Sequence, residues 1–315
     1  MITLFDHQDS IIQPYRVFKE SEIIVDIKRE DLLHDVVSGN KLRKLKYNLQ
    51  EARMQDFDTL LTYGGAYSNH IAATAAAGRI CGFKTIGIIR GEELGIDLPK
   101  TLASNGTLKN AFKLGMRFKF ISRSHYKNKY NLDFLKTLKN EFGEFYSIPE
   151  GGTNQLAVKG TGEILTDNDK QNYDIICVAA GTGGTAAGII NSSSSNQKVF
   201  VFSALKGEFM KHEILKFTDR TNFTVINETN FGGYARSNDE LIEFMNLRFR
   251  ESGIPLDPIY TAKMMYGIEQ LINTNVISRE SRILAIHTGG LQGITGYNKM
   301  LRKKGRKLIA YEGAF

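Results

Sequence analysis

The sequence predicts an α/β protein of two domains, each built on a mainly parallel, open, twisted sheet that helices cover. Two observations predict this class. Short runs rich in Ile, Val, Phe and Tyr alternate with segments of helical periodicity, which is typical of parallel sheets covered on both faces. The length of 315 residues is also sufficient for two cores, although one large α/β domain would not be unusual.

The predicted strands are apolar runs bounded by Gly, Asn or Asp. They cover residues 22–28, 59–63, 83–90, 116–121, 173–180, 198–205, 222–227 and 282–287. The predicted helices cover residues 66–80, 101–114, 130–141, 155–166, 238–251 and 261–274. Sheets of this kind bind ligands where the carboxyl ends of strands meet helix N-termini, so we expect a site at that edge.

The composition excludes several classes of protein. With 42% hydrophobic and 24% charged residues, the chain is neither disordered, collagen-like nor a coiled coil. The formal charge is +7, but the basic residues are spread along the whole chain, so we expect no nucleic-acid partner. The two cysteines cannot form a disulfide framework or a cysteine zinc site, which favours the cytoplasm, and no metal centre is predicted. We expect neither a secretory signal nor a membrane span.

A glycine-rich turn directly after the predicted strand 173–180 is the most informative motif. It consists of Gly181, Thr182, Gly183, Gly184 and Thr185, and a helix of small residues is predicted to begin near its end. Glycines let the backbone turn sharply and direct several N–H groups to one point, and a helix N-terminus attracts anions. The turn therefore predicts a phosphate site, whereas a plain tight turn would need fewer glycines.

The same turn formally fits the dinucleotide fingerprint G-x-G-x-x-A. That fingerprint also needs an acidic residue about 20 positions on, and here no acid appears until Glu208, beyond the next predicted strand. A Walker loop is excluded because no G-K-[ST] follows. A phosphate monoester fits better, although a nucleotide-binding oxidoreductase and a non-catalytic metabolite-binding protein stay open as alternatives.

A second motif surrounds Lys41. Leucines at helical spacing predict a helix from about Lys41, with Ser38 and Asn40 as plausible N-cap residues. In the first turn of a helix the dipole disfavours an ammonium group and lowers its pKa, which suits a lysine that forms a Schiff base. The alternative is one more surface lysine in a basic stretch.

Three further segments follow predicted strands or open predicted helices. Ser68, Asn69 and His70 open a helix after Gly64-Gly65, where exposed N–H groups and hydroxyls suit a carboxylate. Tyr260 and Thr261 stand at the entrance of a later helix. His287 and Thr288 end a strand before Gly289-Gly290, where a core histidine with a threonine cap is the simpler interpretation.

Taken in order, the segments SGNKLRKL, GG-x-x-SNH, GTGGTAAG, LDPIYT and HTGG resemble those of the pyridoxal-phosphate (PLP) enzymes that include D-cysteine desulfhydrase and 1-aminocyclopropane-1-carboxylate (ACC) deaminase. The resemblance covers most of the chain. It implies the tryptophan-synthase-β type of fold (fold type II), with residues 1–44 and 149–315 as a large cofactor domain and residues 45–148 as a small inserted domain. It also implies a homodimer.

The resemblance further implies roles for individual residues. Lys41 would hold the cofactor through an imine, residues 181–185 would bind its phosphate, and Asn69 would contact its ring hydroxyl. Ser68, Asn69 and His70 would line the pocket for the substrate carboxylate. Tyr234 and Tyr260 match active-site tyrosines of the family, and Thr288 would contact the cofactor.

Three positions favour D-cysteine desulfhydrase within this family. ACC deaminases typically have Tyr-Glu in place of Tyr260-Thr261, Leu-Gly-Gly in place of Thr288-Gly-Gly, and Ser-Asn-Gln in place of Ser68-Asn69-His70. A threonine beside the pyridine nitrogen cannot hold it protonated as a carboxylate would, and a neutral ring is the weaker electron sink. We therefore expect a PLP-dependent lyase that takes D-cysteine to pyruvate, sulfide and ammonia, with deamination of ACC to 2-oxobutanoate as the alternative.

Overall fold

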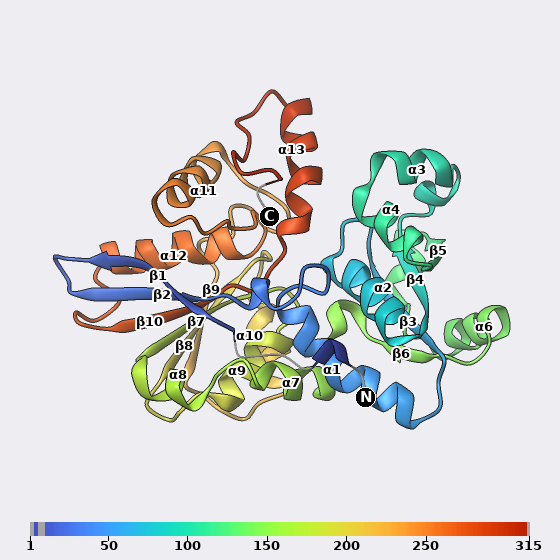
Figure 1. Ribbon diagram of the computed structural model, residues 1–315, viewed down its shortest axis with the longest axis horizontal. Helices are drawn as coiled ribbons and strands as arrows, with labels where there is room; N and C mark the ends of the chain where they lie inside the picture. The colour runs from blue at the N-terminus through green and yellow to red at the C-terminus, as the bar shows by residue number, and fades with distance from the viewer. Residues whose placement is uncertain (1–2, 6–9, 314–315) are drawn as a thin grey trace.

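The computed structural model describes residues 3–5 and 10–313, which form two lobes around two separate sheets (Figure 1). The larger sheet has the strand order β1-β2-β10-β7-β8-β9 and the smaller one has the order β5-β4-β3-β6. The strands are β1 (Ile12–Phe18), β2 (Ile23–Lys28), β3 (Thr59–Gly65), β4 (Lys84–Arg90), β5 (Arg117–Ile121), β6 (Tyr146–Ile148), β7 (Ile175–Ala180), β8 (Lys198–Ser203), β9 (Phe223–Ile226) and β10 (Arg282–Ile286).

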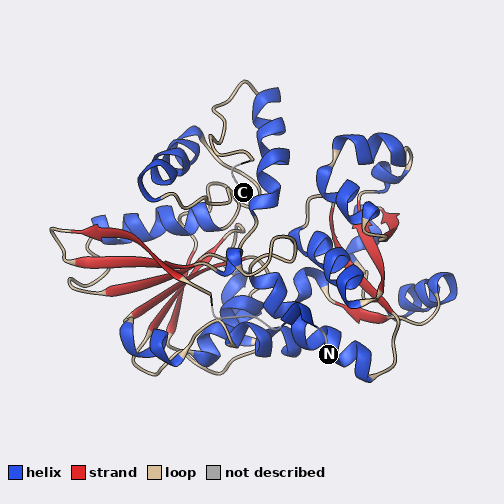
Figure 2. Ribbon diagram, in the orientation of Figure 1, coloured by secondary structure: helices blue, strands red, loops and turns tan. Residues whose placement is uncertain are grey.

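Both sheets are parallel apart from β1, which pairs antiparallel with β2 at one edge. Helices flank the strands in each lobe (Figure 2). They are α1 (Asn40–Met54), α2 (Asn69–Cys81), α3 (Leu98–Ser104), α4 (Gly106–Lys113), α5 (Arg123–Lys127), α6 (Leu132–Phe142), α7 (Gln155–Gly162), α8 (Asp167–Asn172), α9 (Gly184–Ser192), α10 (Phe209–Leu215), α11 (Asp239–Ser252), α12 (Thr261–Asn273) and α13 (Ile294–Lys303).

Strand β7 shows why the large sheet is covered on both faces. Every residue of β7 is buried, and successive side chains enter opposite cores. Cys177 packs with residues of α11, α12 and α13, whereas Val178 packs with residues of α7, α9 and α10. This run is apolar without alternation because both faces are covered, as the predicted fold class requires.

The predicted α/β class is confirmed, and all eight predicted strands are present with ends shifted by at most two residues. Strands β1 and β6 and helices α5, α8, α10 and α13 were not predicted. Strand β1 contains Pro14 and a change of register beside it, which an edge strand tolerates. The proposed domain bounds stay a proposal, and α1 crosses the boundary at residue 44.

Two predictions about helices are wrong. Residues 101–114 do not form one helix, because the chain breaks at Asn105, whose side chain accepts a hydrogen bond from Leu108 N and so caps α4. The helix predicted over 155–166 ends at Gly162, and Thr166 instead caps α8 with a reciprocal capping box.

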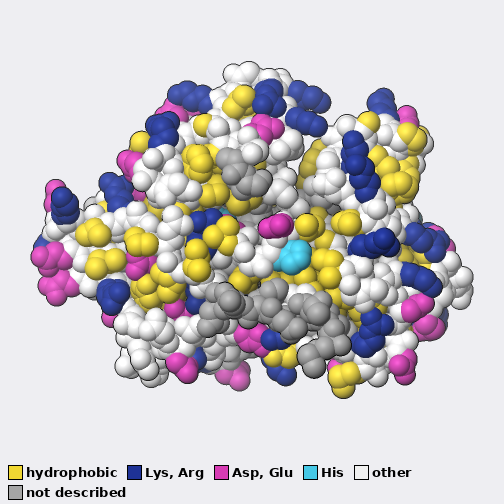
Figure 3. Space-filling model, viewed as in Figure 1, with side chains coloured by type: hydrophobic (Ala, Val, Ile, Leu, Met, Phe, Trp, Pro, Cys, Tyr) yellow, Lys and Arg dark blue, Asp and Glu magenta, His cyan; other side chains and the backbone are white. Residues whose placement is uncertain are grey.

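On the face seen in Figure 3, Lys and Arg side chains are scattered over both lobes among Asp and Glu rather than gathered in one patch. Among residues 3–5 and 10–313, no helix has the length and apolar character needed to cross a bilayer. No cluster of three His, Cys, Asp or Glu residues suited to a metal ion occurs in that same part of the chain.

Candidate active site

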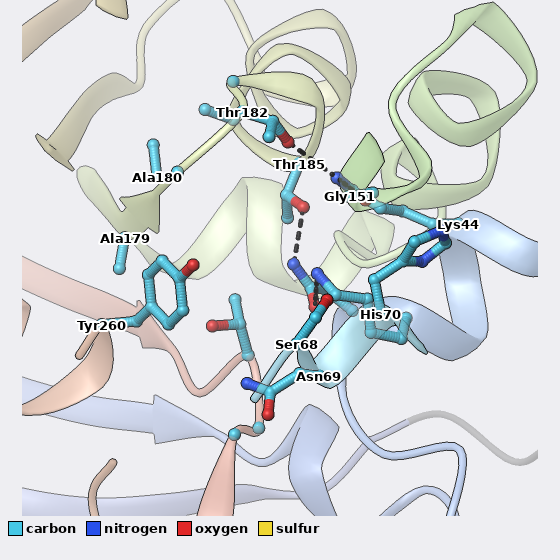
Figure 4. Close-up of a pocket in the computed structure, with 18 of the residues that line it drawn as sticks. Lys44, Ser68, Asn69, His70, Gly151, Ala179, Ala180, Thr182, Thr185 and Tyr260 are labelled. Carbon is cyan, nitrogen blue, oxygen red and sulfur yellow. Dashed lines mark hydrogen bonds between the residues drawn. The ribbon is translucent and has the colours of Figure 1, made fainter. Parts of the chain in front are cut away.

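One pocket lies between the lobes, where the ends of β3, β7 and β10 meet the starts of α1, α2, α9 and α12. Figure 4 shows its labelled side chains arranged around a common space. Of the predicted site residues, those that line the pocket are Lys41, Ser68, Asn69, His70, Gly181, Thr182, Gly183, Thr185, Tyr234, Tyr260 and Thr288. Gly184, the first residue of α9, is not in the lining; it is buried, and a Cβ at this position would lie 2.7 Å from the Thr153 side chain. Segments far apart in the sequence thus converge as the predicted fold requires.

The backbone before Lys41 touches the loop after β10. Gly39 has a φ of 65°, and a Cβ at this position would lie 2.1 Å from the carbonyl oxygen of Thr288. The N–H of Asn40 donates to that same oxygen at 3.3 Å. The expected N-cap residues are wrong, since Gly39 is the N-cap and no side chain caps α1. Only glycine at position 39 lets the two backbone segments come this close, and their contact brings Lys41 and Thr288 to one pocket.

The Lys41 amine is the predicted nucleophile, and its surroundings lower its pKa. Its Nζ donates to Asn40 Oδ1 at 3.2 Å, and burial lowers the pKa of Lys41 to about 8 although the charge of Asp257 opposes the shift. The lowered pKa agrees with the expectation, but desolvation is its main cause rather than the helix dipole.

Lys44 is a site residue that the sequence interpretation missed, since it counted as one of several surface lysines. Its side chain is buried, and its Nζ donates to Gly151 O at 3.0 Å, Thr153 Oγ1 at 2.9 Å and Thr182 Oγ1 at 3.4 Å. Burial and the nearby Lys41 ammonium hold the pKa of Lys44 well below its usual value. The i,i+3 spacing from Lys41 could have indicated a shared face of the helix.

The turn 181–185 has the form of an anion cradle. Gly183 has a φ of 78° and serves as the N-cap of α9, whose first N–H groups have no partner within the helix. Lys44 reaches Thr182 on one side, and Asn40 Nδ2 donates to Thr185 Oγ1 at 2.8 Å on the other. Backbone donors, hydroxyls and an amine at one helix start suit a phosphate, so this donor set fits the phosphate that the turn predicts.

The start of α2 supplies the second polar wall. Ser68 is the N-cap and accepts from Ile71 N, which leaves its hydroxyl hydrogen free to donate. Asn69 Oδ1 accepts from Gln292 Nε2 at 3.0 Å, so its amide NH2 is available to the pocket. Figure 4 shows Ser68 and Asn69 at the wall that the start of α2 contributes, and the hydrogen bond between Asn69 and Gln292 joins this wall to the segment that follows β10.

His70 is buried and neutral. Its Nε2 lies 2.8 Å from Thr62 Oγ1, and that hydroxyl donates to Ile148 O, so Nε2 carries the hydrogen and Nδ1 is left without a partner. Burial and the charges of Lys41 and Lys44 hold the pKa of His70 well below its usual value. The ring therefore offers a hydrogen-bond acceptor and no positive charge.

Two tyrosines complete the lining. The rings of Tyr234 and Tyr260 meet edge to face with centroids 6.2 Å apart, and burial raises the pKa of both phenols. Thr261 does not line the pocket, because its hydroxyl donates to Asp257 Oδ1 at 2.8 Å, whereas Thr288 does line it. Among the described residues that line the pocket there are two lysines, Lys41 and Lys44, and no Asp or Glu.

A parallel-sheet fold that brings a lysine amine of lowered pKa to a phosphate cradle defines a class of enzyme, and comparison with known proteins identifies the class. Residues 10–289 match the family described as pyridoxal-phosphate dependent enzyme, and the chain belongs to that family. The resemblance inferred from the motifs is thereby confirmed.

The names of individual relatives refer to ACC deaminase and D-cysteine desulfhydrase. The chain is 33% identical over 296 residues to a Thermotoga maritima protein provisionally assigned as an ACC deaminase, and the match covers 87% of this chain and 91% of that protein. It is 32% identical over 301 residues to the mitochondrial bifunctional D-cysteine desulfhydrase/ACC deaminase of Arabidopsis thaliana, covering 87% and 73%. The crystal structure of an ACC deaminase homologue superposes with a TM-score of 0.79 at 28% identity and covers 94% of each chain.

The chain is thus similar to PLP-dependent lyases and deaminases over nearly its whole length. It is a PLP-dependent enzyme of that kind with the tryptophan-synthase-β type of fold, and pyridoxal phosphate is its cofactor. The two alternatives from other classes, an oxidoreductase and a non-catalytic binding protein, gain no support from these comparisons.

Proposed function

We propose that this enzyme eliminates the β-substituent of a small amino acid and that D-cysteine is its favoured substrate. The products are pyruvate, sulfide and ammonia, with one water consumed. The observation that carries the proposal is the absence of any Asp or Glu from the described pocket lining, where Thr288 is the candidate partner of the cofactor ring nitrogen. Without a carboxylate beside it, the ring nitrogen of the bound cofactor would stay neutral, which would suffice for α-deprotonation followed by loss of a good leaving group.

The cofactor would be held at three points of the pocket. Lys41 would bind it covalently, the turn 181–185 with Lys44 would bind its phosphate, and the free amide NH2 of Asn69 would donate to its ring hydroxyl. When bound, pyridoxal phosphate withdraws electrons from the substrate α-carbon. The lowered pKa of Lys41 leaves a useful fraction of neutral amine near pH 7–8, so Lys41 Nζ can take the α-proton.

The substrate carboxylate would lie against the start of α2. The Ser68 hydroxyl and the first N–H groups of that helix are donors there. His70 would contribute the acceptor Nδ1 rather than a charge, because its ring is neutral. Tyr260 would keep its phenol proton at neutral pH and could therefore donate to the departing group.

The second candidate is deamination of ACC, which two relatives favour by name. Both hypotheses are tested by incubating the purified enzyme with D-cysteine, L-cysteine, other β-substituted amino acids of both configurations, and ACC. Pyruvate and sulfide from D-cysteine, with little 2-oxobutanoate from ACC, would support the desulfhydrase. Turnover of ACC alone would overturn it in favour of the deaminase.

We also propose a homodimer in the cytoplasm. The dimer rests on the family resemblance, and the free state of Cys81 and Cys177 supports a reducing compartment. Light scattering should give about twice the chain mass of 35.3 kDa.

A further inference from the structure

The loop between β9 and α11 carries Tyr234 to the pocket, and packing alone does not hold this side chain. Tyr234 is 45% exposed. It lines the active-site pocket and also a second cavity, which Phe231, Ala235 and Tyr297 help to line. The contact of Tyr234 with Tyr260 therefore requires that the loop backbone place Tyr234 beside that ring.

That backbone is strained. Phe231 and Ala235, which are not glycines, have φ values of 52° and 54°, and Gly232 and Gly233 between them have values of 86° and 109°. Residues other than glycine rarely adopt positive φ values. Such values persist only where the surrounding structure imposes them. The loop thus needs anchors outside itself.

Lys263 on α12 is such an anchor. Its side chain is 2% exposed, and its Nζ donates to the carbonyl oxygens of Asn230 and Gly233, each at 2.7 Å. Burial lowers the pKa of Lys263 to about 8, while the charge of Asp257 opposes that shift. A buried amine is costly unless it is well hydrogen-bonded, so these two contacts hold the amine and the loop together.

The position of Lys263 links the two tyrosines of the pocket. Tyr260 is the N-cap of α12, and Lys263 follows one helical turn later. Gly233, which accepts one of the lysine hydrogen bonds, directly precedes Tyr234. One helix therefore carries Tyr260 and also binds the backbone that carries Tyr234.

We propose that Lys263 is a positioning residue of this enzyme, which binds the Asn230 and Gly233 carbonyls and so keeps Tyr234 beside Tyr260 at the pocket. The role of Tyr234 in turnover rests on the proposed function, whereas the anchoring of the loop does not. The test therefore needs one readout on activity and one that requires no substrate.

The activity readout is a double-mutant cycle. Lys263→Met and Tyr234→Phe should each lower kcat/KM by up to about 10²-fold, which is the loss that a small misplacement of an active-site group can cause. The double variant should be no slower than Tyr234→Phe alone, because Lys263 acts through that phenol. Two losses that multiply in the double variant would overturn the proposal.

The second readout is hydrogen exchange of the amides of residues 231–237 in the holoenzyme without substrate. Exchange should be faster in Lys263→Met and unchanged in Tyr234→Phe. Ile268→Ala is the matched control, since it shortens a buried side chain of the same helix that, being aliphatic, donates no hydrogen bond to the loop carbonyls. It should lower the unfolding midpoint, leave loop exchange unchanged, and give a loss of activity that multiplies with Tyr234→Phe.

If Lys263→Met folds poorly, Lys263→Gln replaces it, because its amide is one bond shorter and should give a smaller change in the same direction. Faster loop exchange in an enzyme that turns over none of the tested substrates would support the anchor and contradict the proposed function. If loop exchange is unchanged and the two losses of activity multiply in the double variant, Lys263 does not anchor the loop, and the proposed function is unaffected.

Discussion

Asn40 donates to Thr185 across 145 positions of sequence, at 2.8 Å from Nδ2 to Oγ1, and so joins the start of α1 to the start of α9. The Oδ1 of the same amide accepts from Lys41 Nζ. One side chain thus connects the amine to the anion cradle, and its two contacts use the donor and the acceptor of a single amide.

Lys41→Ala should purify without the yellow colour of a lysine-bound cofactor and without turnover. The physical reason is that Lys44, the other lysine of the pocket, is held at the anion cradle by hydrogen bonds to Gly151, Thr153 and Thr182 and would not replace Lys41 at the aldehyde. Loss of a general base alone costs about 10²–10⁴-fold. Absorbance spectra and borohydride reduction measure this. Lys41→Arg is the control, because it keeps a positive charge but forms no imine, and it should be equally colourless. A reducible chromophore in either variant would contradict the assignment.

Lys44→Met should weaken cofactor binding while keeping the colour at saturating cofactor. A hydrogen bond to a charged group contributes about 1.5–3 kcal/mol, which corresponds to roughly a 10- to 150-fold rise in the Kd for pyridoxal phosphate. Lys46→Met on the same helix is the matched control, because Lys46 pairs with Glu163 outside the pocket and its loss should change the Kd little. Equal effects of the two substitutions would argue against a role for Lys44 in the cradle.

The capture of cofactor by the apoenzyme should depend on pH through Lys41. Because the pKa of Lys41 is lowered to about 8, the neutral amine and the rate of imine formation should increase up to about pH 8 and then level off. A lysine with its usual pKa of about 10.4 would give a rate that continues to rise. Stopped-flow absorbance at a series of pH values distinguishes the two.

The lowered pKa of Lys41 also makes the unfolding free energy of the apoenzyme depend on pH. Between about pH 8 and about pH 10.4 the unfolded chain binds a proton at Lys41 that the folded apoenzyme lacks, so this group makes the unfolding free energy rise with pH in that window. The contribution should be absent from Lys41→Met apoenzyme. A rise of equal size in both proteins would assign it to another group.

Gly39→Ala should destabilise the protein by about 2–4 kcal/mol, since the new Cβ would clash with the Thr288 carbonyl at a positive φ. Urea unfolding measures this. Gly106→Ala is the control, because it lies at the exposed start of α4 with nothing within 4 Å of its Cβ, and it should be neutral or stabilising by about 0.5 kcal/mol. An unchanged midpoint in Gly39→Ala would show that the two loops can separate without cost.

The sequence predicts local structure well where consecutive residues determine it. The buried run of β7 and the glycine turn after it lie where the pattern indicates, since the period of apolar residues and the need for positive φ are properties of the chain itself. The pattern did not reveal strand β1, because Pro14 and an exposed face obscure it until β2 lies alongside.

By itself, then, the sequence determined the α/β class, the glycine cradle and the choice of Lys41 as the candidate amine. Only the tertiary structure decided that Lys44 is buried against Thr153 and Thr182, that desolvation lowers the pKa of Lys41, and that Lys263 anchors the loop of Tyr234. The physical reason is that the burial and the hydrogen-bond partners of a side chain depend on segments far away in the chain, which come together only when the two sheets pack.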